Sequence, residues 1–108
     1  MPKLEYSPVA LEKLGAIYRY IANELSNPAG AANTIQSIRA KITTLKLAPQ
    51  LGAPLYSRSA EVPERLKDVR ILLCGQYLAL YRCDDKSVNI LCIYHTKEDY
   101  LSHLFETH

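Results

Sequence analysis

Apolar residues recur at helical spacing through two stretches of the first half of the chain. Ser7-Pro8 gives the first stretch a typical helix start, with serine as the N-cap and proline at the first helical position. Asn27-Pro28 repeats that signal before the second stretch. The pattern predicts helices over about residues 8–25 and 28–47, with Pro49 ending the second. The very short link between them favours an antiparallel helical hairpin.

The second half of the chain alternates short apolar runs with turn residues, which is the pattern of β-strands. We expect strands over residues 69–73, 77–82 and 88–94, with turns at 75–76 and 84–86 between them. Turns this short make consecutive strands antiparallel. Strict alternation in the last strand would place Val88, Ile90, Cys92 and Tyr94 on one face, and Asn89, Leu91 and Ile93 on the other.

Three further segments complete the predicted organisation. Residues 3–6 alternate like a short strand, residues 49–65 are rich in proline and polar residues like a loop, and residues 98–105 have the spacing of a short helix. The predicted fold class is therefore α+β, a helical hairpin packed on a small antiparallel β-sheet. The order is β-α-α-β-β-β with a short C-terminal helix, in a single domain over residues 1–108.

Composition narrows the class of protein. The chain has 108 residues, of which 48% are hydrophobic and 22% charged, as in a soluble globular domain with one modest core. No apolar run approaches the ~18 residues that cross a bilayer, and the N-terminus lacks the apolar stretch of a signal peptide. We therefore expect a cytoplasmic protein with no membrane partner. The net charge of +2 is too small to indicate nucleic-acid binding by itself.

The cysteines Cys74, Cys83 and Cys92 are odd in number and lie in strand-like segments without a close pair. We expect them to be reduced and mostly buried as small apolar residues. The stretch from Cys92 to His95 resembles half of a metal site, but no second half is visible. We therefore expect neither a metal nor a cofactor.

The candidate chemistry lies in the last third of the chain. Arg70 lies in the first of the three strands, and His95, Lys97 and Tyr100 follow the last within six residues. Folded as consecutive antiparallel strands, this region is expected to bring Arg70 towards the other three residues. A cation beside proton-transfer groups is a suitable arrangement for cleaving or binding a phosphodiester.

Each of these residues also has a structural interpretation. Arg70 either clamps a phosphate or forms a surface ion pair with Asp68 or Asp99. His95 is either a general acid or base or a structural histidine at a strand end. Lys97 is either a phosphate-binding cation or a solvated side chain. Tyr100 either stacks on a base or donates a proton, or it anchors the last helix to the core.

Motifs spread over nearly the whole chain resemble those of the RelE/ParE superfamily of toxins from type II toxin–antitoxin modules. Each is weak alone, and their order and spacing are what make the resemblance specific for the fold. They are Ser7-Pro-x-Ala10, Tyr20-Ile21, Asn27-Pro28, Leu45-x-x-x-Pro49-x-x-Gly52, Arg70, Gly75-x-Tyr77, Tyr81-Arg82 and His95-x-Lys97-x-Asp99-Tyr100.

The resemblance implies one of two activities. RelE-like toxins cut mRNA in the ribosomal A site without a metal, and ParE-like toxins poison DNA gyrase. Both are neutralised by a cognate antitoxin in a hetero-oligomer. Our leading expectation is a ribosome-dependent mRNA endoribonuclease that uses Arg70, His95, Lys97 and Tyr100.

Two alternatives are a gyrase inhibitor without nuclease activity and an inactive relative that binds only its antitoxin. Many relatives carry arginine where Cys92 stands, and strong RelE-type nucleases tend to be more basic than +2. Both departures favour the gyrase alternative.

Overall fold

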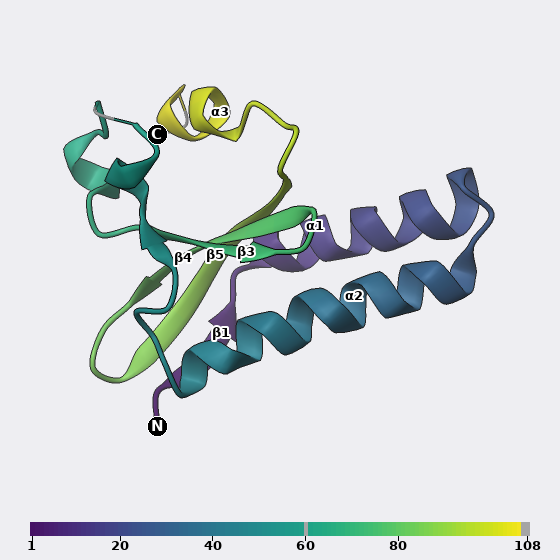
Figure 1. Ribbon diagram of the computed structural model, residues 1–108, viewed down its shortest axis with the longest axis horizontal. Helices are drawn as coiled ribbons and strands as arrows, with labels where there is room; N and C mark the ends of the chain where they lie inside the picture. The colour runs from purple at the N-terminus through teal and green to yellow at the C-terminus, as the bar shows by residue number, and fades with distance from the viewer. Residues whose placement is uncertain (60, 107–108) are drawn as a thin grey trace.

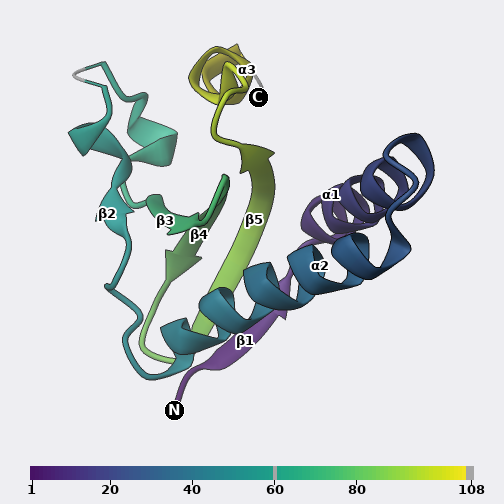
Figure 2. The ribbon, with the colours of Figure 1, turned by 45° about the vertical axis from the view of Figure 1, so that its right-hand side comes forward.

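The computed structural model describes residues 1–59 and 61–106 and has the predicted α+β architecture (Figure 1). The helical hairpin lies against one face of a five-stranded sheet and extends beyond it (Figure 2). The main elements are β1 (Lys3–Tyr6), α1 (Pro8–Arg19), α2 (Pro28–Thr43), β2 (Ala53–Pro54), β3 (Arg70–Cys74), β4 (Tyr77–Cys83), β5 (Ser87–His95) and α3 (Tyr100–Glu106).

Both predicted helix starts are confirmed by their caps. The Ser7 hydroxyl accepts a hydrogen bond from the Ala10 N–H at 3.0 Å, and the Asn27 side chain accepts one from the Gly30 N–H at 3.0 Å. The Ser7 hydroxyl also donates to the Leu91 carbonyl at 2.7 Å, so that this cap ties α1 to β5. Local capping therefore also positions the helical hairpin on the sheet.

The first helix differs from the predicted span of 8–25. The α-helix ends at Arg19 and continues as a π-helical turn over Tyr20–Glu24, in which the Leu25 N–H bonds to the Tyr20 carbonyl at 3.2 Å. Ser26 then takes a left-handed φ of 49°. Because a π-turn holds one more residue than an α-turn, apolar spacing alone does not reveal it. The α-helical part of the second helix likewise ends early, at Thr43, and a 3₁₀ turn follows.

The sheet order is β1-β5-β4-β3-β2, and it differs from the predicted sheet in two respects. β1 pairs in parallel with β5, so the sheet is mixed and not wholly antiparallel. The predicted loop 49–65 contains β2, which pairs with the start of β3. β1 is parallel to β5 because the helical hairpin that follows β1 returns the chain to the end of the sheet at which β1 begins.

The sheet separates two apolar cores. One lies between the helical hairpin and the sheet, and the other lies between the opposite face of the sheet and the segment 55–69 with α3. The first core includes Leu14, Ile38, Ile42, Leu72, Tyr81 and Ile90, and the second includes Leu55, Leu66, Ile71, Leu78, Leu80 and Tyr94.

A β-bulge in β5 corrects the predicted faces of this strand. Tyr81 pairs with Ile90 and Leu80 pairs with Cys92, which leaves Leu91 as the extra residue. Val88 and Ile90 therefore share the helix-side core with Ile93, while Cys92 and Tyr94 face the second core. The prediction that Val88, Ile90, Cys92 and Tyr94 share one face is thus wrong beyond Ile90.

Cys74 and Cys92 are buried and Cys83 is half-buried, and none of the three forms a disulfide. Within residues 1–59 and 61–106, no cluster of three or more His, Cys, Asp or Glu side chains is arranged to hold a metal ion. The helices of the same part of the chain all fall short of the length and apolar character needed to cross a membrane.

Candidate functional site

The predicted site residues do not form one cluster. Arg70 begins β3 in register with Tyr81, whereas His95 ends β5 in register with Tyr77. These register positions lie four residues apart on β4, about 13 Å along the strand, and β3 and β5 flank β4 on opposite sides. The expectation that the strands bring Arg70 towards His95 is therefore wrong.

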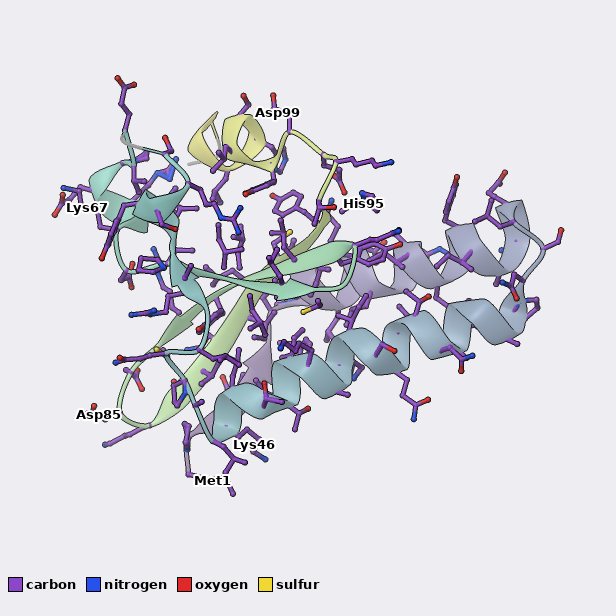
Figure 3. All side chains as sticks on the ribbon, in the orientation of Figure 1. Met1, Lys46, Lys67, Asp85, His95 and Asp99 are labelled. Atoms are coloured by element: carbon purple, nitrogen blue, oxygen red, sulfur yellow. The ribbon has the colours of Figure 1, made fainter. Side chains whose placement is uncertain are left out.

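The reason lies in strand direction. In three consecutive antiparallel strands the first and third run the same way, so the start of the first and the end of the third lie at opposite ends. Figure 3 shows His95 near Asp99, far from Asp85 in the β4–β5 turn, and Arg70 belongs to the Asp85 end of the sheet. The order and directions of the predicted strands were therefore sufficient to place Arg70 and His95 at opposite ends of the sheet.

Arg70 is half-buried and has backbone partners. Its guanidinium donates to the Gly52 carbonyl at 2.6 Å and to the Gln50 carbonyl at 3.3 Å. The suggested partner Asp68 instead pairs with Arg82 at 3.0 Å. Arg70 thus holds the segment that leads into β2 against the sheet, which is a structural role.

Replacing Arg70 by methionine is expected to lower the free energy of unfolding by about 2 kcal/mol, because the charge-assisted hydrogen bonds to Gly52 and Gln50 are lost. Urea denaturation measures this change. Arg58→Met is the matched control, since Arg58 is exposed in the loop and its replacement should change stability by less than about 0.5 kcal/mol. An Arg70→Met protein as stable as wild type would contradict the structural role.

His95 is held by local hydrogen bonds at the end of β5. Its Nδ1 accepts the Lys97 N–H at 3.1 Å, and its own backbone N–H donates to the Glu98 carboxylate at 2.9 Å. The neutral ring therefore carries its proton on Nε2, which makes Nε2 a donor and not a base. Lys97 contributes its backbone to this turn, and its side chain is exposed.

Tyr100 belongs to the second core. It begins α3 and packs on Tyr94 with ring centroids 5.9 Å apart, beside Leu101 and Leu104. The hydroxyl of the buried Tyr94 bonds to Nδ1 of His103 at 2.8 Å, and burial raises the pKa of that phenol. These contacts favour the interpretation of Tyr100 as an anchor for α3.

A hollow of about 290 Å³ lies beside His95, between α1 and the neighbouring ends of β4 and β5. We call it the His95 pocket. The Tyr77 and His95 rings meet edge to face with centroids 5.1 Å apart. Burial raises the pKa of Tyr77, with further contributions from the nearby Tyr20 and Glu98. The pocket is lined by Lys13, Ala16, Ile17, Tyr20, Tyr77, Ile93, His95 and Glu98.

Of these lining residues, only His95 was a candidate from the sequence. Tyr20 begins the π-helical turn, and the β-bulge at Leu91 places His95 on the same side of the sheet as Ile93, towards α1. Helical and strand periodicity reveal neither feature. The rings and apolar side chains form a concave surface with one cation, Lys13, and one carboxylate, Glu98, at its margin. Such a surface can hold an apolar or aromatic group by burial.

The architecture is that of a small α+β domain, with a helical hairpin on one face of a five-stranded mixed sheet. A family profile described as the ParE toxin of the type II toxin–antitoxin system parDE matches residues 4–100. The chain therefore belongs to the ParE toxin family, and it is a toxin of a type II toxin–antitoxin system. A search of curated proteins found no match.

Three similar solved structures have a related fold, and one of them comes from a ParDE system. A chain from the chromosomal ParDE system of P. aeruginosa is 29% identical with a TM-score of 0.71, covering 88% of this chain and 96% of that one. A chain from the RelBE2 toxin–antitoxin complex of Mycobacterium tuberculosis is 21% identical with a TM-score of 0.53 (87% and 90% covered). YafQ from E. coli strain BL21(DE3) is 15% identical with a TM-score of 0.50 (97% and 99% covered). The last two show the fold alone.

Proposed function

We propose that this toxin inhibits DNA gyrase by binding to it and does not cleave RNA. The observation that carries the proposal is the separation of Arg70 from His95 at opposite ends of the sheet. RNA cleavage by the 2′-hydroxyl needs a cation at the phosphate beside an acid and a base. Here Arg70 is bonded to backbone carbonyls, and Nδ1 of His95 is occupied by the Lys97 N–H.

The family supports the proposal of gyrase as the target. The chain matches the ParE profile over most of its length. Of the two kinds of toxin in the superfamily described above, the ParE-like toxins are those that poison gyrase. The small net charge of +2 agrees with a target other than ribosomal RNA. The proposed target places the toxin in the cytoplasm.

The proposed partner in the absence of toxicity is a cognate antitoxin, with which the toxin forms a hetero-oligomer. The similar structure from the ParDE system of P. aeruginosa supports this part of the proposal. The described surface also exposes large apolar side chains over α1 and the turn after it, and an antitoxin could cover them. They include Val9, Leu11, Tyr18, Tyr20 and Leu25.

The test compares two targets with the same purified protein. Added to gyrase and supercoiled DNA, the toxin should inhibit supercoiling or stabilise cleavage complexes. Added to a purified translation reaction, it should leave the mRNA in the ribosomal A site intact. In induced bacteria, pulse labelling should show DNA synthesis stopping before protein synthesis. Cleaved A-site mRNA without any effect on gyrase would replace this proposal by the endoribonuclease alternative.

Two variants sharpen this test. Lys97→Gln and Tyr100→Phe remove the proposed cation and hydroxyl while retaining the Lys97 backbone bond to His95 and the packing of residue 100 on Tyr94. We expect both to arrest growth like wild type, because neither group is needed for binding. A nuclease that uses these groups would lose roughly 100-fold or more of its cleavage rate in each variant.

A further inference from the structure

We propose that the His95 pocket receives a single aromatic side chain of the toxin's protein target. This inference rests on the proposed function, in that the toxin acts by binding. It adds a contact site and the chemistry of the group that the site accepts.

The size and walls of the pocket match one aromatic ring. A volume of about 290 Å³ is large enough to receive a single aromatic side chain. Three of its lining side chains are the rings of Tyr20, Tyr77 and His95, and Ala16, Ile17 and Ile93 provide apolar surface. Aromatic rings pack favourably edge to face or offset, and the Tyr77–His95 pair already shows the first geometry.

Polar groups at the pocket suit the heteroatom of such a ring. Glu98 can accept a hydrogen bond from an indole N–H or a phenol O–H, and the tautomer of His95 makes Nε2–H a donor. Glu98 accepts a hydrogen bond from the His95 backbone N–H at 2.9 Å, which restrains its carboxylate beside the pocket. This preorganisation lowers the entropic cost of binding.

The charges favour a protein over a nucleic acid. Lys13 is the one cation among the lining residues, and Glu98 balances it. Lys13 also lies 4.9 Å from the centre of the Tyr94 ring, which holds the ammonium close to the protein. A phosphate chain would meet the Glu98 carboxylate without gaining the several cations that nucleic-acid sites use.

One aromatic wall of the pocket is also exposed to a partner. The lining residue Tyr20 has 56% of its surface exposed. Tyrosines around an anchor pocket are typical of the energetically dominant centre of a protein interface. The π-helical turn that begins at Tyr20 is a feature that is frequent at functional sites.

The first test uses small probes and the intact chain. N-acetyl-tryptophanamide titrated into the ¹⁵N-labelled protein should give saturable shifts, at about millimolar probe, confined to amides around Ile17, Tyr20, Ile93 and His95. Adenosine monophosphate is the competing probe. Tighter binding of the nucleotide would overturn the proposal in favour of a nucleic-acid site, and binding of neither probe would overturn it altogether.

A substitution that fills the pocket provides a second test, with a matched control on another helix. Ala16 is exposed and lines the pocket, so Ala16→Phe should block it without disturbing the core, and binding of the tryptophan probe should be lost. Ala40→Phe is the control, because Ala40 is exposed on α2 away from the pocket. Thermal unfolding should show that both variants remain folded. Probe binding that survives Ala16→Phe would place the probe elsewhere and refute the assignment.

Measuring gyrase inhibition by the same variants separates this inference from the proposed function. If wild type inhibits gyrase, Ala16→Phe should raise the inhibitory concentration at least about tenfold, as expected for loss of an interface anchor, and Ala40→Phe should not. Equal inhibition by all three proteins would remove the pocket from the interface while leaving gyrase as the target. A wild-type protein inactive on gyrase would refute the proposed target, and the probe titration would still decide the chemistry of the pocket.

Discussion

Replacing Gly52 by alanine is expected to lower the free energy of unfolding by about 3 kcal/mol or more, because a Cβ at this position has no space. It would lie 2.7 Å from the Ile71 carbonyl oxygen and 2.7 Å from the Tyr81 ring, and both atoms belong to the buried sheet. The Gly52 N–H donates to the Tyr81 hydroxyl at 2.9 Å, and that hydroxyl donates to the Pro49 carbonyl at 2.8 Å. Relieving the clash would break this chain of hydrogen bonds.

The control is the same substitution at another glycine. A Cβ at Gly15 in α1 would meet the flexible side chain of Arg19 at 3.2 Å, which can move. Gly15→Ala should therefore stabilise the protein by roughly 0.5–1 kcal/mol through helix propensity. Urea denaturation of the two variants should give shifts of opposite sign. Equal small shifts would show that the sheet edge at Gly52 adapts more easily than its packing implies.

Stability is expected to fall as the pH rises above 9. Burial raises the pKa of the Cys74 thiol to about 11 from its usual value of 9.0. Between these values the unfolded chain releases the proton while the folded protein keeps it, so the unfolded state gains stability as pH rises. Below pH 9 the full contribution of Cys74 to stability is present. Its loss by pH 11 amounts to about 2–3 kcal/mol.

Buried tyrosines add to this fall in stability at high pH. Burial raises the pKa of Tyr6, Tyr81 and Tyr94 above the usual value of 10.0, so each also favours the folded state less as the pH rises past 10. Urea denaturation at pH 7.5, 9 and 11 measures the sum. Cys74→Ala should reduce the decline between pH 9 and 11, and Cys83→Ala is the matched cysteine control. A decline equally steep in Cys74→Ala would show that Cys74 does not contribute.

The candidate site was predicted only in part. His95, a candidate from the sequence, ends β5 and lines the pocket, and its role in function stays a prediction. Arg70 was grouped with it because both flank the strand region, although strand direction places them at opposite ends. Tyr20 and Glu98 were not candidates, because their proximity to Tyr77 arises from elements distant in the sequence. Spacing along a chain does not encode such proximity.

What the sequence determined by itself was the set of local elements and the fold class. Ser7 and Asn27 cap the helices through bonds to residues three positions along, and alternation of apolar residues marks the strands, so these features depend on nearby residues. Only the tertiary structure decided the parallel pairing of β1 with β5, the bulge at Leu91 and, through it, the face on which His95 lies. A one-residue bulge exchanges the two faces of a strand beyond it. Its position is set by partners on other elements, which include the Tyr81 pairing and the Ser7 bond to the Leu91 carbonyl.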